Sequence, residues 1–360
     1  MARYNRIFAA LDGAATQEAV ARRAFSIAHD NNAEVMFGHV IDSVPYEANG
    51  IDFTYYKPAG DSTAERVAMV DAAIVDGYNV IVMPGFAFGE TLAEVADIYP
   101  EIKFVALDVA EGEGGFTATE NVFSAVYQEQ LSGYMAGYAA VKLGYKHLGY
   151  LGGMAVPAVQ RFGYGFLQGV DAAAKELGIV GDIKIEYIYG NQFYGDADIT
   201  AVMDTWYGEK GVELVFACGG GIWTSAAEAA KKVGGKIIGV DVDQAAIIDG
   251  GYGEGMTITS AMKGLRPTTI DTLTDVVING NWDKYVGKIQ SLGMISGDDA
   301  SLNYVQLPTA TTQFEDGKFT EADYAALVKG IFEGTIVVSG DTTVEPTVTN
   351  SNVQYLGNLK

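Results

Sequence analysis

Short apolar runs alternate along the chain with longer segments in which apolar residues recur at helical spacing. The short runs have the length and composition of buried strands, and the longer segments have the periodicity of amphipathic helices. Most apolar runs end at a glycine or an acidic residue, as expected where a strand turns into a helix. Strands that alternate with helices predict parallel sheets covered by helices on both faces, so the sequence predicts an α/β fold.

The pattern predicts strands at residues 6–11, 34–41, 51–56, 80–84, 103–107, 122–126, 147–152, 184–189, 212–218, 236–240, 255–261, 288–293 and 304–307, and β character at 335–359. It predicts helices at residues 16–31, 62–76, 91–98, 128–143, 156–177, 197–209, 225–232, 266–279 and 321–332. Ser62 and Glu65 predict a capping box at the start of one helix. Gly133 and Gly137 lie four apart in another, whose polar residues indicate a buried helix of a soluble domain rather than a membrane helix.

Residues 212–244 form the most informative unit of the pattern. An apolar run leads into three glycines, Gly219 to Gly221, then Trp223 and a helix, and a second apolar run ends at Asp241. Ligands of open parallel sheets bind beside the carboxyl ends of strands. An aromatic ring there stacks on a flat ligand, and a carboxylate accepts hydrogen bonds from hydroxyl groups. Gly221, Trp223 and Asp241 are therefore predicted to face a flat ligand with polar edges.

The glycine run has two other interpretations, a dinucleotide site and a simple packing turn. A dinucleotide site needs GxGxxG between strand and helix, and here GGGIWTSA has no third glycine at the required offset. Trp223 also occupies the place where a pyrophosphate would need the backbone. A turn that merely lets the helix pack closely explains the glycines but not an indole at a strand end.

Composition limits the domain organisation and the class of function. The 360 residues fit two α/β domains, and a net charge of -23 disfavours nucleic acid and anionic membrane as partners. The single cysteine, Cys218, excludes a disulfide within the chain, and its apolar surroundings predict a small buried side chain. One cysteine and three histidines disfavour a zinc site of the usual ligands. No catalytic residue set, cofactor site or metal site is legible, which disfavours an enzyme such as a sugar-phosphate or nucleoside hydrolase.

The predicted strands and helices divide between two lobes with a ligand cleft between them. The N-terminal lobe is expected to comprise residues 1–122 plus about 256–287. The C-terminal lobe is expected to comprise residues 123–255 plus about 288–360. No stretch has the roughly 18 consecutive apolar residues of a membrane span.

Five segments in order resemble the basic membrane protein family of ABC-transporter substrate-binding lipoproteins, which includes purine nucleoside-binding members. They are residues 71–108, YQEQLSGYMAGYAA at 127–140, 149–170, IIGVDVDQ at 237–244 and TSAMKG at 259–264. The resemblance implies two flavodoxin-like lobes of type I periplasmic-binding-protein architecture, joined by three crossovers. It also implies a nucleoside-like ligand, no cofactor, an ABC permease as partner and an extracytoplasmic, lipid-anchored location. The chain as written carries neither a signal peptide nor a lipid-accepting cysteine near its start.

The same resemblance implies roles for single residues. Trp223 corresponds to the aromatic that stacks on the base, and Asp108 and Asp241 to acids that bind polar edges of the ligand. Lys263 corresponds to the lysine after the TS motif. Gly85 and Phe86 line the same site. Arg161, near the start of a helix, could face either the ligand or solvent.

Residues 3–53 resemble instead the first β-α-β unit of the universal stress protein family, through the strand ending LDG, the RRAFSIA segment and the strand ending HVID. That resemblance implies a composite chain, and it keeps open a cytoplasmic ATP-binding module, although the family's later G-x2-G-x9-G segment is missing. Asp12 is either a ligand contact or a plain turn residue. Replacing the first unit removes a stacking ring and hydrogen-bond partners, which predicts a loss of about 2–6 kcal/mol in nucleoside binding.

Overall fold

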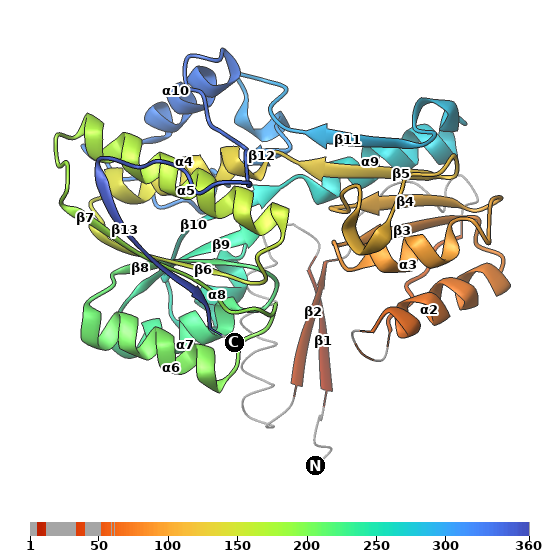
Figure 1. The fold of residues 1–360 in the computed structure, drawn as a ribbon, viewed down its shortest axis with the longest axis horizontal. Helices are drawn as coiled ribbons and strands as arrows, with labels where there is room; N and C mark the ends of the chain where they lie inside the picture. The colour runs from red at the N-terminus through yellow and green to blue at the C-terminus, as the bar shows by residue number, and fades with distance from the viewer. Residues whose placement is uncertain (1–5, 12–33, 40–51, 59, 61, 360) are drawn as a thin grey trace. The chain divides into compact units, whose positions relative to one another are not determined.

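The computed structural model describes residues 6–11, 34–39, 52–58, 60 and 62–359. The chain divides into two compact units. The larger unit contains Gln128–Lys263 and Gly293–Lys360, and the smaller unit contains Ser43–Tyr127 and Gly264–Leu292. Each unit is an α/β layer structure with its own sheet (Figure 1).

The larger unit is built on a seven-stranded sheet in the order β12-β10-β9-β8-β6-β7-β13. All neighbours in this sheet are parallel except β12, which runs antiparallel to β10. The strands are β6 (His147–Gly152), β7 (Ile183–Tyr189), β8 (Leu214–Cys218), β9 (Lys236–Asp241), β10 (Thr257–Lys263), β12 (Val305–Gln306) and β13 (Ser351–Asn358). The central strands β6, β8 and β9 are almost entirely buried, as expected for strands covered on both faces.

Helices cover both faces of this sheet, α4 and α5 on one face and α6, α7 and α8 on the other (Figure 1). The helices are α4 (Glu129–Lys142), α5 (Pro157–Glu176), α6 (Ala197–Asp204), α7 (Trp223–Val233), α8 (Ala245–Tyr252) and α10 (Glu321–Phe332). Strand residues alternate between the two layers. Tyr150 and Phe216 contact Phe166 of α5, whereas Leu151 and Val215 belong to the core beneath α6 and α7.

The smaller unit has a parallel four-stranded sheet in the order β11-β5-β4-β3. Its strands are β3 (Val80–Pro84), β4 (Lys103–Leu107), β5 (Val122–Tyr127) and β11 (Lys288–Leu292), and its helices are α2 (Thr63–Val75), α3 (Phe88–Val95) and α9 (Leu265–Leu273). The capping box predicted from Ser62 and Glu65 is confirmed at the start of α2. Short helical turns lie at η2 (Glu113–Gly115), η3 (Thr205–Lys210), η4 (Thr274–Ile278), η5 (Trp282–Lys284) and η6 (Ala300–Leu302).

Strands β1 (Arg6–Leu11) and β2 (Glu34–His39) pair in parallel, as predicted for the first two strands. The rest of the predicted stress-protein unit, Asp12 included, lies outside the described residues. The α/β class with parallel sheets is confirmed.

The chain passes between the units after Tyr127, Lys263 and Leu292. Each crossing comes one strand later than the boundary expected from the sequence, because β5, β10 and β11 stay hydrogen-bonded in the sheet that precedes the crossing.

One strand prediction was wrong, and one prediction of β character was confirmed only in part. Residues 52–58 form no strand, and Phe53 and Tyr55 are exposed, so the β-prone side chains there have no neighbouring strand to pack against. In the predicted β tail, only β13 is a strand. The segment before it runs over α5, where Asp171 accepts hydrogen bonds from Asn350 and Ser351.

Glycines bring α4 and α5 into close contact. A Cβ atom built on Gly133 or Gly137 would lie 2.2 Å from the backbone oxygen of Phe162 or Phe166 respectively. Reciprocally, a Cβ atom on Gly165 or Gly169 of α5 would lie 2.1 or 2.0 Å from a backbone oxygen of α4. The prediction that this helix is buried is confirmed, and the glycine pair has a packing function.

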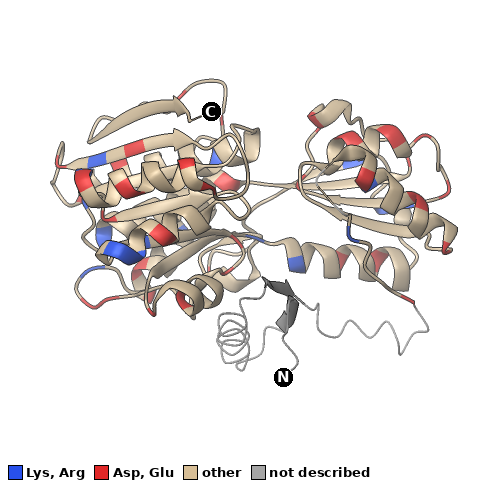
Figure 2. Ribbon diagram, turned by 90° about the horizontal axis from the view of Figure 1, so that it is seen from below, with Lys and Arg blue, Asp and Glu red and all other residues tan. Residues whose placement is uncertain are grey.

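The excess of acidic residues is spread over the helices and loops of both units rather than gathered on one element (Figure 2). Within the part of the chain that the structure describes, no helix is long and apolar enough to cross a membrane.

Candidate functional site

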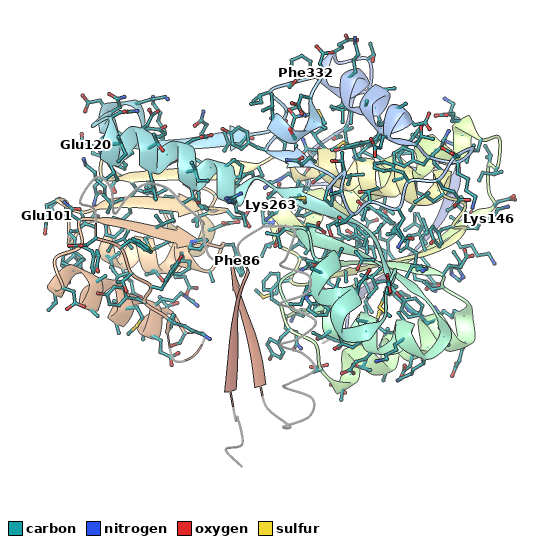
Figure 3. The ribbon with its side chains drawn as sticks, turned by 180° about the vertical axis from the view of Figure 1, so that it is seen from behind. Phe86, Glu101, Glu120, Lys146, Lys263 and Phe332 are labelled. Atoms are coloured by element: carbon teal, nitrogen blue, oxygen red, sulfur yellow. The ribbon has the colours of Figure 1, made fainter. Side chains whose placement is uncertain are left out.

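The carboxyl ends of four neighbouring strands form a row at one edge of the larger sheet. The order β10-β9-β8-β6 brings Lys263, Asp241, Cys218 and Gly152 to successive positions along this edge. Figure 3 shows Lys263 where β10 leaves the sheet. Two of the predicted ligand-binding residues, Asp241 and Lys263, therefore lie on adjacent strands. Gly221 and Trp223 follow the neighbouring strand β8.

Asp241 occupies a strained backbone conformation. Its φ is 66°, and the N–H of Val242 donates to the carbonyl of Val240 at 2.7 Å, which closes a γ-turn with Asp241 at its centre. Such turns with positive φ are rare and cost on the order of 1–3 kcal/mol. The side chain of Gln244 holds the turn in place, because its Oε1 accepts from the N–H of Val240 at 2.9 Å. The turn aims a carboxylate away from the regular strand direction.

Lys263 is the cation beside this carboxylate. Its Nζ lies 3.2 Å from Asp241 Oδ1 and 4.0 Å from Glu129 Oε1, and its side chain is only 4% exposed. The ammonium also lies 5.4 Å from the centre of the Phe162 ring, within cation–π distance. A buried ammonium is costly unless it is paired, so these contacts explain how Lys263 is retained at this depth.

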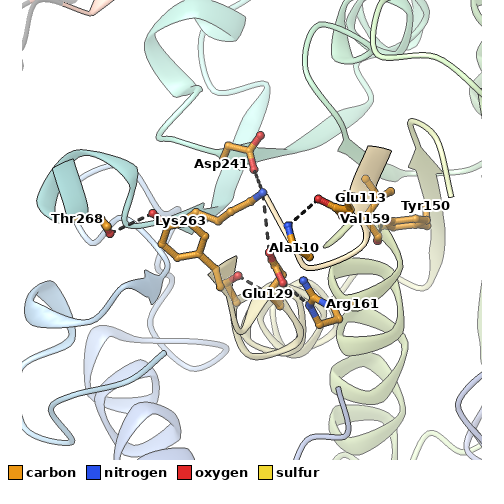
Figure 4. Close-up of polar contacts among 11 residues, drawn as sticks. Ala110, Glu113, Glu129, Tyr150, Val159, Arg161, Asp241, Lys263 and Thr268 are labelled. Carbon is orange, nitrogen blue, oxygen red and sulfur yellow. Dashed lines mark hydrogen bonds and ion pairs between the residues drawn. The ribbon is translucent and has the colours of Figure 1, made fainter. Parts of the chain in front are cut away.

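Glu129 and Arg161 complete the charge cluster, which we define as Glu129, Arg161, Asp241 and Lys263 (Figure 4). Glu129 is the first residue of α4 and is fully buried, and its Oε2 accepts a hydrogen bond from Arg161 Nε of α5. The positive end of the α4 dipole favours a carboxylate at this position. The cluster pairs two carboxylates with two cations, so its formal charges balance.

A nearby acid, Asp243, is partly buried in the loop after β9. Burial raises the pKa of the Asp243 carboxyl, and hydrogen bonds from the Ala245 N–H and the Thr311 hydroxyl oppose that rise. Asp243 fixes the loop after β9 to the segment around Thr311 and so supports the position of Asp241.

The glycine run after β8 accommodates another segment of the larger unit rather than a phosphate. A Cβ atom on Gly219 or Gly153 would lie 2.9 or 2.5 Å from the Phe193 ring, and Gly221 N–H donates to the Phe193 carbonyl at 2.7 Å. Gly219 and Gly220 also have positive φ values of 146° and 50°. The run therefore lets the Phe193 ring lie flat against the ends of β6 and β8.

Trp223 is the first residue of α7 and is 8% exposed. Its ring belongs to the core beneath α6 and α7 and meets the Tyr252 ring edge to face at 5.9 Å. Most of the indole thus packs inside the larger unit. A stacking role for Trp223 stays a prediction.

The other predicted residues lie at strand ends of the smaller unit. Gly85 and Phe86 follow β3, and Asp108 follows the adjacent strand β4. Gly85 N–H donates to the Leu107 carbonyl at 2.7 Å, which joins the two strand ends. Asp108 has a φ of 67° and so shares the left-handed conformation of Asp241. Of the non-glycine residues that the structure describes, only these two acids and Asn191 have positive φ.

Sequence reasoning left Arg161 open, assigned Glu129 no role beyond marking a soluble helix, and overlooked Phe193. An acid directly after a strand, at the first turn of an otherwise apolar helix, was the available signal for Glu129. Cys218 is buried and unbonded to another cysteine, as predicted, and burial strongly raises the pKa of its thiol. Among the described residues no group of three His, Cys, Asp or Glu side chains could hold a metal ion.

Solved structures with a similar fold include two ABC-transporter solute-binding proteins. One, from Aeropyrum pernix K1, is 21% identical, covers 92% of this chain and 86% of its own, and has a TM-score of 0.55. The other, from Conexibacter woesei DSM 14684, is 19% identical, covers 94% and 99%, and has a TM-score of 0.57. Similarity at this level of identity concerns the fold alone, and it confirms the predicted type I periplasmic-binding-protein architecture.

Sequence relatives include the ABC transporter nucleoside-binding protein BmpA of Lactococcus lactis, 27% identical over 204 residues, and basic membrane protein B of Borreliella afzelii, 27% identical over 235 residues. The first match covers 54% of each chain and the second 64%, so the chain spans about half to two thirds of the length of these relatives. The model of the Bmp family, described as ABC transporter substrate-binding protein PnrA-like, matches residues 30–295. Since that match spans most of the 360 residues, the chain belongs to the Bmp family of PnrA-like ABC transporter substrate-binding proteins.

Proposed function

We propose that this protein is the solute-binding component of an ABC importer and that it binds a nucleoside-like small molecule. The family membership supports a binding protein rather than an enzyme. The Lactococcus lactis relative is named a nucleoside-binding protein, which supports this ligand class. A permease is then the partner, and an extracytoplasmic, lipid-anchored location follows from the family resemblance. Two Pyrococcus relatives are named as lipoproteins.

The observation that carries the proposal is the strained turn at Asp241 beside the buried ammonium of Lys263. A carboxylate and an ammonium 3.2 Å apart present an acceptor and donors together, which suits hydroxyl groups and ring nitrogens of a nucleoside. Strained backbone is retained where surrounding structure fixes it, and such positions cluster at ligand sites. Asp108 has a similar positive φ at a strand end of the smaller unit.

Within this proposal, Asp241, Lys263 and Asp108 bind the polar edges of the ligand, and Gly85, Phe86, Gly221 and Trp223 contact its flat faces. The family model matches from residue 30 onward, and the residues at the start of the chain depart from the family pattern as read from the sequence. We therefore expect weaker nucleoside binding than a protein with the family's usual first unit would have.

Calorimetric titration of the purified chain with adenosine, guanosine, inosine and ATP tests the proposal. Saturable binding of a nucleoside, with one site per chain, is the expected result. Asp241→Asn keeps the size of the side chain and removes its charge, so it should weaken binding about tenfold to a hundredfold. Binding of ATP without binding of any nucleoside would contradict the proposal, and conversion of nucleoside to free base, followed by chromatography, would reveal an enzyme.

A further inference from the structure

The charge cluster contains two residues, Glu129 and Arg161, to which the proposed binding function assigns no role. Glu129 is completely buried, whereas Asp241 on the other side of Lys263 is 34% exposed. Lys263 thus has an inner partner shut off from solvent and an outer partner that solvent reaches. A ligand that approaches from solvent meets Asp241 first.

Glu129 and Lys263 also lie next to two of the chain crossings. Glu129 is the second residue after the crossing at Tyr127, and Lys263 is the last residue before the crossing into Gly264. The backbone of both residues is held by secondary structure of the larger unit, since Glu129 begins α4 and Lys263 ends the buried strand β10. Lys263 Nζ lies 4.0 Å from Glu129 Oε1, and this ion pair connects the two chain segments within the larger unit.

Arg161 fixes the inner carboxylate. Its Nε donates to Glu129 Oε2, which leaves Oε1 directed to Lys263 (Figure 4). Phe162, the next residue of α5, places its ring beside the same ammonium. One turn of α5 therefore orients both the carboxylate and the cation of the inner pair.

We propose that Glu129, held by Arg161, is a positioning residue that keeps the Lys263 ammonium in place when a ligand engages Asp241. This inference rests on the proposed binding function. With Glu129 present, Lys263 keeps a buried counter-ion while Asp241 turns to the ligand. Without it, Lys263 loses this buried counter-ion, and the ligand must compete more strongly with Lys263 for the Asp241 carboxylate.

The test uses Glu129→Gln, which keeps the size of the side chain but removes its charge. The matched control is Glu186→Gln. Glu186 is also a buried carboxylate of the larger unit, 2.7 Å from Lys210 Nζ and 3.5 Å from His147 Nε2, in β7 and outside the charge cluster. Equilibrium dialysis with labelled adenosine, guanosine and inosine gives the affinities, and urea unfolding without ligand gives the stabilities.

Glu129→Gln is expected to weaken nucleoside binding at least about tenfold, and Glu129→Asp to restore part of the loss because the charge returns. Glu186→Gln should destabilise the protein while leaving the affinity within about twofold. Without ligand, Glu129→Gln and Lys263→Met should be non-additive in unfolding free energy, because each removes the same ion pair.

The outcomes separate the inference from the proposed function. Wild-type nucleoside binding that Glu129→Gln leaves within about threefold would overturn the positioning role. An equal loss of affinity in Glu186→Gln would overturn it too, since any buried carboxylate would then serve. If the wild-type chain binds none of the three nucleosides but the two substitutions are non-additive, the proposed function fails. Glu129 is then only a structural partner of Lys263, and its proposed role in ligand binding is refuted together with the proposed function.

Discussion

The close contact between α4 and α5 predicts that Gly165→Ala destabilises the larger unit. A Cβ atom on Gly165 would lie 2.1 Å from the carbonyl oxygen of Gln130 and 2.7 Å from its carbonyl carbon and Cα. These are backbone atoms, which cannot rotate away. Ordinary carbon–oxygen contact begins at about 3.3 Å, so the helices must separate by about 1 Å. Overpacking of this kind costs about 1–3 kcal/mol.

A control must remove the general preference of helices for alanine over glycine. Gly208 lies in the helical turn η3, and a Cβ atom there would meet nothing within 4 Å. Gly208→Ala therefore carries the propensity gain without the clash. The difference in unfolding free energy between the two variants should be about 1–3 kcal/mol, which corresponds to about 2–12 °C in the unfolding temperature of a domain of this size.

Thermal and urea unfolding followed by circular dichroism measure this difference. Gly165 faces Gln130, which is adjacent to Glu129, so Gly165→Ala should also loosen the Glu129–Arg161 pair and weaken nucleoside binding. If Gly165→Ala is as stable as Gly208→Ala, the helices are not in the contact described, and the reasoning about the glycines is refuted.

Two further predictions concern single acids. Replacing Asp241 by glycine should leave the protein about 1 kcal/mol more stable than replacing it by alanine, because glycine adopts a φ of 66° without the steric penalty that alanine has. Equal urea midpoints of the two variants would show that the turn is not strained. The Lys284 ammonium, with the Tyr285 hydroxyl and the Asn279 amide, lowers the pKa of Asp275 from its usual 3.8 to about 2. The charged form of Asp275 therefore stabilises the folded state above the unfolded pKa. That contribution should be lost as pH falls through about 2. The wild-type protein should therefore unfold at a higher temperature than Asp275→Asn at pH 6, and this difference should be lost near pH 2. A difference that stays constant with pH would show that the pKa of Asp275 is not lowered in the folded state.

Local signals in the sequence predicted most of the elements because the central strands are buried apolar runs and several helices have a capping residue or an amphipathic pattern. The final helix, Glu321–Phe332, was predicted with its observed bounds, and it begins with a capping box at Thr320 and Asp323. The run at 51–56 was wrong because β propensity cannot form a strand without a partner. The boundaries between units fell one strand early because strand pairing is a long-range property.

The candidate site was only partly visible in the sequence. Asp241 stood out because it ends an apolar run, and Lys263 because it follows the TS motif of the family. Strand order brings the two residues together. Glu129 and Arg161 come from two helices whose contact depends on glycines at Gly133 and Gly165, and no local pattern joins them. The packing of Phe193 on the glycine run is likewise a contact between segments far apart in the sequence.

The proposed role of the strand-end residues in binding a nucleoside-like solute can be tested in one titration. Wild-type, Asp241→Asn and Glu186→Gln chains are titrated with adenosine, guanosine and inosine. We expect saturable binding by the wild type and by Glu186→Gln, and binding weakened about tenfold or more by Asp241→Asn. Nucleoside affinity that is unchanged in Asp241→Asn, or wild-type binding of ATP and of no nucleoside, would contradict it.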